Sequence, residues 1–162
     1  MTTPAAYPSQ YNGTYTDYLK APCDRSGAVR LVTDTVTIAD NTTAGTIIGL
    51  VPFRKGFQLI YGGGIGVGDL DTVTNVVLDV GYIYKDNDTV TYINDTDAFV
   101  DGATQGQAGG LISLVGATGA FGVRTGLAFE ALADGWITLT VQAGPVSTAG
   151  TATFNLLTAY AG

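Results

Sequence analysis

The sequence predicts an all-β protein, an antiparallel β-sandwich of the jelly-roll kind. Thr is its commonest residue, Val and Ile are plentiful, and 23 of the 162 residues are Gly. β-Branched side chains suit a pleated sheet, and Gly suits tight turns between short strands. No helical i, i+3, i+4, i+7 pattern persists, and about eight strand-like runs alternate with turn signals. Eight strands in two packed sheets make a jelly roll, although periodicity alone leaves another β-sandwich open.

Residues 1–28 are expected to form an extended N-terminal arm that precedes one sandwich domain, residues 29–162. Pro4, Pro8 and Pro22 disfavour a helix in this arm. Its tyrosines can pack flat on another surface while their hydroxyls stay wet, which is favoured at interfaces. One helical face, or packing of the arm on its own domain, are the alternatives. The four tyrosines are Tyr7, Tyr11, Tyr15 and Tyr18.

Four strands are expected in the first half of the domain. Residues 29–38 alternate, with Leu31, Thr33, Thr35 and Thr37 on one face, and neither face is purely apolar, which predicts an edge or interface strand. The following apolar runs are bounded by Gly, Pro and Asp, as strands usually are. These runs are residues 46–51, which Pro52 is expected to end, then 57–61, and then 75–84.

The glycine-rich segment 62–68 superficially suggests a phosphate-binding loop. A Walker loop requires Lys and then Ser or Thr after its last Gly, whereas Asp69 follows here. The dinucleotide spacing G-x-G-x-x-G is also absent. The segment is therefore expected to be a flexible strand, or a loop that closely approaches a neighbouring backbone.

Residues 85–101 contain much of the negative charge and are expected to flank a strand at 89–93. Clustered carboxylates are ligands that Ca²⁺ prefers, so a structural Ca²⁺ site is one interpretation. The EF-hand pattern is absent, however, and Asp residues beside a strand more often form turns by bonding the local backbone. The acidic residues are Asp86, Asp88, Asp95, Asp97 and Asp101.

Small residues dominate 102–122, which is expected to be a loop around an apolar centre. Leu111 and Ile112 in this centre are candidate contact residues for a partner or a second subunit. Residues 123–133 could begin a strand, or form a single helical turn around Glu130.

The C-terminal region has the clearest strand pattern. Residues 136–141 alternate strictly, a Gly144-Pro145 turn follows, and 151–160 form the return strand. The expected core combines apolar positions from all of these runs. Its members are Ile47, Leu50, Phe57, Leu59, Val77, Ile83, Ile137, Leu139, Val141, Phe154 and Leu156.

Composition argues against several classes of function. The net charge is −7 and the pI about 4.1, whereas binding to nucleic acid or to an anionic membrane needs clustered Lys and Arg. No apolar run approaches the roughly 20 residues of a membrane span. The first residues lack a signal peptide's basic start and apolar core, so we expect synthesis in a cytoplasm without export by that route. The sequence contains no His and only one Cys, Cys23, so we expect no enzymatic site, no metal centre built on His or Cys, and no cofactor.

Several segments together resemble the small cement or decoration proteins of tailed bacteriophage heads. The resemblance covers roughly residues 30–160 and consists of a pattern of strands and turns. Its parts are Asp34-Thr35-Val36-Thr37-Ile38, Gly45-Thr46-Ile47-Ile48, Pro52-Phe53-Arg54-Lys55-Gly56-Phe57-Gln58-Leu59, Asn75-Val76-Val77-Leu78-Asp79-Val80-Gly81 and Trp136-Ile137-Thr138-Leu139-Thr140-Val141.

The resemblance implies a jelly-roll-like homotrimer on the outside of the capsid. Such proteins tie neighbouring major capsid protein subunits together after the head expands, and they have no catalytic residues. The arm or the 102–122 loop would then contact the shell. An alternative is a binding module of a phage fibre, baseplate or adhesin that recognises a host surface glycan. A major capsid subunit is a further, less favoured alternative, because no long helix is expected.

Overall fold

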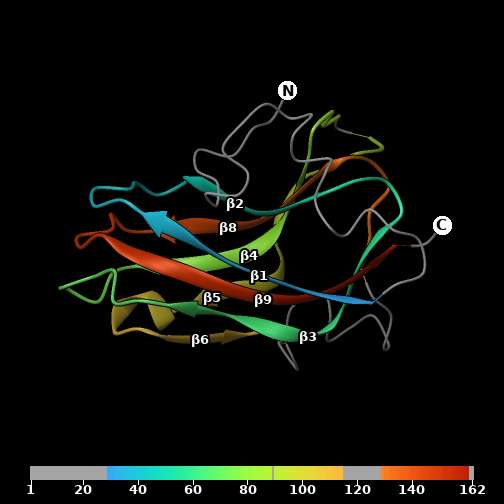
Figure 1. Ribbon diagram of the computed structural model, residues 1–162. Coiled ribbons are helices and arrows are strands. Elements are labelled where there is room, and N and C mark those ends of the chain that lie inside the picture. Colours follow the sequence, from blue (N-terminus) through green and yellow to red (C-terminus); the bar gives the residue numbers. More distant parts are fainter. Residues whose placement is uncertain (1–28, 89, 115–128, 161–162) are drawn as a thin grey trace.

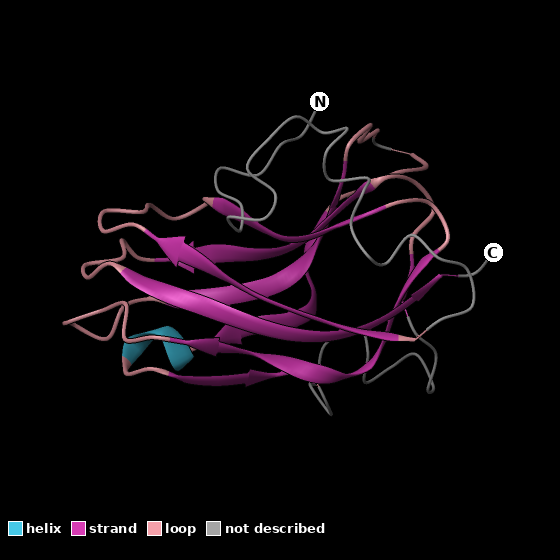
Figure 2. Cartoon of the chain, viewed as in Figure 1, coloured by secondary structure: helices cyan, strands magenta, loops and turns pink. Residues whose placement is uncertain are grey.

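The protein is described by a computed structural model that defines residues 29–88, 90–114 and 129–160. Two antiparallel sheets pack face to face, and the only helix among these residues is a short 3₁₀ turn, η2 (Figures 1 and 2). The prediction of an all-β sandwich is therefore confirmed. The elements are β1 (Arg30–Ile38), β2 (Ile47–Phe53), β3 (Phe57–Val67), β4 (Val77–Tyr84), β5 (Asp95–Ala103), η2 (Gln105–Gln107), β6 (Gly110–Ser113), β7 (Phe129–Glu130), β8 (Gly135–Ala143) and β9 (Gly150–Tyr160).

The strand order is that of a jelly roll. One sheet has the order β1-β9-β3-β6, with the two-residue β7 pairing beside β3, and the other has the order β2-β8-β4-β5. Consecutive long strands alternate between the sheets from β1 to β4, β8 then inserts between β2 and β4, and β9 inserts between β1 and β3. Every strand pair is antiparallel. The chain therefore wraps as the two Greek keys of a jelly roll do.

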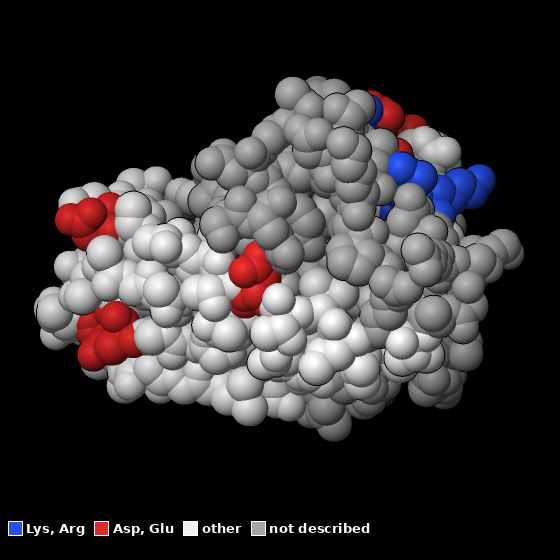
Figure 3. All heavy atoms as spheres, viewed as in Figure 1, with Lys and Arg blue, Asp and Glu red and all other residues white. Residues whose placement is uncertain are grey.

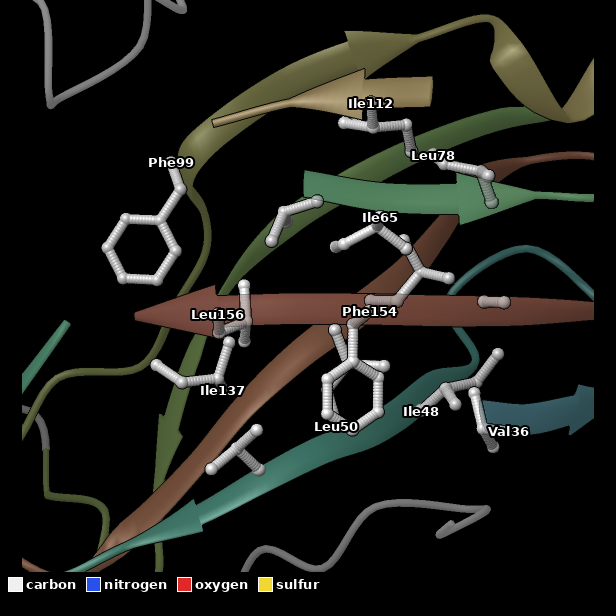
Figure 4. Close-up of a cluster of buried hydrophobic side chains, with 14 of the residues drawn as sticks. Val36, Ile48, Leu50, Ile65, Leu78, Phe99, Ile112, Ile137, Phe154 and Leu156 are labelled. Carbon is white, nitrogen blue, oxygen red and sulfur yellow. The ribbon is translucent and has the colours of Figure 1, made fainter. Parts of the chain in front are cut away.

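The core lies between the two sheets and is formed by alternate residues of each strand (Figure 4). On β9, the side chains of Ala152, Phe154, Leu156 and Thr158 are all fully buried, as the alternation predicts. Burial of one such large apolar side chain stabilises the fold by about 1.5–3 kcal/mol. Removal of this apolar surface from water is thus the main force that holds the sheets together.

For two of the residues expected in the core, the prediction is wrong by one position. Ile47 and Val77 are only partly buried, whereas the neighbouring Ile48 and Leu78 are fully buried. Side chains alternate between the faces of a strand, so a shift of one residue exchanges core and surface. In each case two adjacent apolar residues left the register open, and cross-strand pairing decided it.

Pro52 does not end β2, which continues through it to Phe53. The prediction of a stop at this position was wrong because β2 is an edge strand of its sheet. Pro cannot donate a backbone hydrogen bond. On an edge strand this position can face away from the neighbouring strand, so the sheet loses no hydrogen bond there. β1 is also an edge strand, as its two-sided pattern predicted.

The acidic and small-residue regions also differ from expectation. Residues 90–93 form no strand, and the strand of this region is β5 instead. The region expected to be a loop around Leu111 contains η2 and the strand β6. Glu130 belongs to the short strand β7 rather than to a helical turn. The predicted arm lies outside the described residues.

The glycine-rich segment forms the second half of β3, and the expectation of close backbone approach is confirmed there. Gly63 has φ +112°, and a Cβ built on it would lie 2.1 Å from the carbonyl oxygen of Asn155. Only Gly permits this approach of β3 to β9. Gly66, three residues later, has room for a Cβ, which would make an ordinary van der Waals contact with Thr153 O at 3.7 Å.

Candidate contact surface

The outer face of the β1-β9-β3-β6 sheet presents a flat array of uncharged side chains. The register aligns Thr33 with Asn155, Thr35 with Thr153 and Thr37 with Thr151, and the rows continue onto β3 and β6. We call this surface the open face. Its residues are Leu31, Thr33, Thr35 and Thr37 on β1, Thr151, Thr153, Asn155 and Leu157 on β9, Gly64 and Gly66 on β3, and Leu111 and Ser113 on β6.

Cross-strand hydrogen bonds hold the polar side chains of the open face in place. Thr33 Oγ1 donates to Asn155 Oδ1 at 2.8 Å, and the hydroxyls of Thr35 and Thr153 lie 2.9 Å apart. β-Branched threonines have few rotamers, so these pairs lose little additional freedom when a partner binds. The face is therefore a preorganised surface rather than a set of mobile side chains.

Two apolar side chains protrude from the open face. Leu31 and Leu111 are 62% and 64% exposed. Leu111 lies across Gly64, because a Cβ on that glycine would be 2.9 Å from Leu111 Cδ1. Exposed leucines within an uncharged surface resemble the centre of a protein interface, where charged residues are depleted.

Charged side chains gather mainly at the two ends of the sandwich, and none belongs to the set of residues that defines the open face. In Figure 3 blue side chains gather at the upper right with a few red ones beside them, two red patches mark the left-hand end, and one red patch lies on the face between the ends. Near the basic end, the backbone N–H of Lys55 donates to Asp134 Oδ1 at 3.1 Å, and that of Lys85 donates to the Asp134 carbonyl at 2.8 Å. Asp34 on β1 is opposite Phe154 and so belongs to the inward-facing set.

The acidic end consists of loops that bond to one another through a buried carboxylate. Asp71 is 3% exposed and accepts hydrogen bonds from the N–H groups of Val73, Asn75 and Val76. Ser147 Oγ also donates to it, at 3.1 Å. Burial alone would raise the pKa of Asp71, but these four donors outweigh it and lower the pKa. Asp71 therefore organises the loop structurally rather than acting as a site.

Asp88 has a similar role in the region considered for calcium. Its Oδ1 accepts hydrogen bonds from the N–H groups of Val90, Thr91 and Tyr92, and these bonds lower its pKa. The expectation that such aspartates form turns is confirmed here. Within the described ranges, no three His, Cys, Asp or Glu side chains are grouped so that they could hold a metal ion.

A third carboxylate, Asp79 on β4, is destabilised rather than stabilised as an anion. It is 5% exposed, and its Oδ1 accepts one hydrogen bond from Gly102 N–H at 2.8 Å. Burial raises its pKa, the Gly102 bond lowers it, and the charges of Asp101 and Asp97 raise it again, with a net increase. Asp79 faces away from the inter-sheet core, opposite Thr140 of β8.

The predicted contact residues have different locations. Leu111 is on the open face, but Ile112 is 2% exposed and packs in the core opposite Ile65 of β3. The four tyrosines of the arm lie outside the described residues. The alternation of residues 29–38 places Thr33, Thr35 and Thr37 on one face, but it cannot combine them with β9 and β6, because periodicity does not determine strand order.

Three comparisons relate the chain to known proteins. No protein-family model and no curated protein matches the sequence. Among solved structures, a chain from the capsid of Ralstonia phage GP4 is similar with a TM-score of 0.60 and 25% identity, over 85% of this chain and 87% of that chain. A chain from the Cyanophage Pam1 capsid asymmetric unit has a TM-score of 0.55 and 16% identity, over 82% and 85% respectively. The chain thus has the fold of chains found in two phage capsids.

No helix in the described part is long and apolar enough to cross a membrane.

Proposed function

We propose that the protein is a cement protein on the outside of a tailed-phage head. The observation that carries this proposal is the likeness to a chain of the Ralstonia phage GP4 capsid, which covers most of both chains at 25% identity. The resemblance of the strand and turn pattern to head-decoration proteins supports the same conclusion. The expected function is to bridge neighbouring major capsid protein subunits and stabilise the assembled shell.

The open face is the surface that we expect to contact the capsid. It is uncharged in a chain of net charge −7, it is held by its own hydrogen bonds, and it exposes Leu31 and Leu111. Such a surface can be desolvated without leaving a charge unpaired. A ligand that binds only the assembled shell stabilises it by mass action.

A homotrimer would increase the effect of each contact. Three copies of one surface on a three-fold or quasi-three-fold position would engage the shell simultaneously, and avidity would exceed the affinity of a single copy. A location on the exterior also agrees with the negative net charge, because a protein outside the shell does not contact the packaged nucleic acid.

Glycan recognition is less favoured by the arrangement of aromatic residues. Sugar-binding platforms need exposed rings, but Trp136 is only 2% exposed. Phe53, Phe57 and Tyr84 are buried and pack in a shared ring cluster at one end of the sandwich.

Binding to heads tests the proposal directly. Purified protein is mixed with expanded heads that lack it, sedimented, and the heads are then heated. Saturable co-sedimentation together with a higher melting temperature of the shell is the expected result. A protein that stays in the supernatant, or that binds without stabilising heads, would contradict cementing. Light scattering on the free protein tests for a trimer.

A further inference from the structure

The outer edge of β1 differs from the other sheet edges among the described strands. β1 pairs with β9 along its whole length of nine residues without a register shift, and no described strand pairs with its other side. An edge of this kind can accept a further strand, and proteins usually protect such edges by short length, Pro, bulges or charged side chains. Whether β1 has this protection is decided by comparison with β2, β5, β6 and β7.

The other edges are all protected in one of these ways. β6 and β7 are only four and two residues long, and β2 contains Pro52 and a register irregularity. β5 pairs with β4 through two irregularities and carries Asp95, Asp97 and Asp101. β1 contains neither Pro nor Gly and has one acidic residue, Asp34. It is therefore the described edge that is most open to strand addition.

The backbone of β1 directs a row of hydrogen-bonding groups toward this edge. In an antiparallel pair, alternate residues bond to the partner strand, and the residues between them point both backbone groups away from it. Thr35 N–H donates to Asp34 Oδ1 at 2.8 Å, which identifies Thr35 as one of the residues that point away from β9. The side chains of this set are exposed and lie on the open face, so a strand added here would extend that face. The set is Leu31, Thr33, Thr35 and Thr37.

Asp34 disfavours addition of a second copy of β1. It is the central residue of Arg30–Ile38, so full-length antiparallel pairing of two β1 strands places the two Asp34 side chains directly opposite each other. Like charges in opposite positions destabilise a strand pair. A shift of register separates the charges but shortens the ladder. The edge is thus open to another strand and closed to its own copy.

We propose that the edge of β1 binds an extended segment of a major capsid subunit as an added strand, an inference that rests on the proposed cement function. Asp34 Oδ2 has no hydrogen-bond partner among the described residues. A carbonyl of the added strand would replace Asp34 Oδ1 as the acceptor for Thr35 N–H, and the released carboxylate would pair with a Lys or Arg of that strand. Main-chain bonds then supply affinity, and the charge selects against a second copy.

Amide exchange in the free protein tests whether the edge is open. We expect the N–H groups of Thr33 and Thr37 to exchange rapidly in nuclear magnetic resonance spectra, because they point away from β9. Those of Asp34 and Val36, which point toward β9, should be protected. Slow exchange at Thr33 and Thr37 would show that another part of the chain or another copy already covers this edge, and would overturn the proposal.

Two variants of one residue test strand addition on the capsid. Thr33→Pro and Thr33→Ala both remove the hydroxyl that donates to Asn155, but only Pro also removes the N–H at the edge. After both are shown to melt cooperatively, we expect Thr33→Pro to bind heads that lack the protein about tenfold more weakly than Thr33→Ala. Equal affinities for the two variants would overturn strand addition and leave cementing intact. Failure of the unaltered protein to bind heads would instead contradict cementing.

A capsid-free measurement tests the role of Asp34 and remains decisive if Thr33→Pro does not fold. Asp34→Ala removes the like charges that oppose self-pairing, so we expect a larger mass in solution than that of the unaltered protein, measured by light scattering. Addition of Thr33→Pro to this variant should restore the original mass, because it removes a donor from the edge. An unchanged mass for Asp34→Ala would contradict the selective edge, whatever the result with heads.

Discussion

Ser147 Oγ donates a hydrogen bond to Asp71 Oδ1 at 3.1 Å and so joins two loops that are 76 residues apart in the chain. The same carboxylate accepts three backbone N–H groups from its own loop. One buried charge thus closes the acidic end of the sandwich. The jelly roll depends on such links because its neighbouring loops come from distant parts of the sequence.

Replacement of Asp71 should lower stability, and the loss should depend on pH. Asp71→Ala removes the acceptor for four donors, so we expect a melting temperature several degrees lower at neutral pH. The folded-state pKa is lowered, so the carboxylate's contribution is present above its unfolded pKa, near 3.8, and is lost as pH falls through the folded value. Thermal unfolding from pH 7 to pH 2 measures this. Asp40→Ala, in an exposed loop, is the control. Equal melting temperatures for the two variants would show that Asp71 does not anchor these loops.

The opposite sign is expected for Asp79. Its folded-state pKa is raised, so the ionised form is disfavoured by folding, and stability falls as pH rises through the interval between the unfolded and folded values. Asp79→Asn keeps an oxygen for Gly102 N–H but removes the charge beside Asp101 and Asp97. We therefore expect a higher melting temperature at pH 7 and no gain below the unfolded pKa. A loss of stability at pH 7 would contradict this view of Asp79.

Two glycines of β3 should respond differently to the same substitution. Gly63→Ala places a methyl group 2.1 Å from Asn155 O at a φ that L-residues rarely adopt, so we expect a loss of about 3 kcal/mol in the free energy of unfolding. Gly66→Ala meets nothing closer than 3.7 Å and should be neutral or slightly stabilising. Urea denaturation of both variants measures the difference. Similar values for the two would argue against this packing of β3 on β9.

The sequence patterns predicted the strands whose residues alternate between apolar and polar. They missed the short strands that form only because they pair with a neighbouring strand. The stretch 151–160 alternates cleanly, and its buried set was correctly predicted around Phe154. Residues 89–93 are equally rich in β-branched side chains. However, the Asp88 carboxylate accepts hydrogen bonds from the N–H groups of Val90, Thr91 and Tyr92, so these groups cannot pair with a neighbouring strand. β6 and β7 are short and depend on pairing with β3, which no local pattern reveals.

The candidate site was predicted only in part for a related reason. Leu111 was identified as a contact residue from its apolar character, and it is exposed on the open face. The threonines around it come from strands distant in sequence. They form one surface only because β9 inserts between β1 and β3. That insertion is a property of the topology, and periodicity contains no information about it.

A positive charge placed on the open face tests the central claim most directly. Thr35 and Thr153 are partners on this face, so the double variant Thr35→Arg, Thr153→Arg should fold, yet it would require desolvation of two charges at the contact. The matched control is Thr43→Arg, in an exposed loop at the acidic end. Affinity for expanded heads that lack the protein is measured by co-sedimentation, after both variants have been shown to melt cooperatively. The account predicts at least a tenfold loss of affinity for the double variant, about 1.4 kcal/mol or more, and little change for the control. Undiminished binding and head stabilisation by the double variant would contradict attachment through the open face.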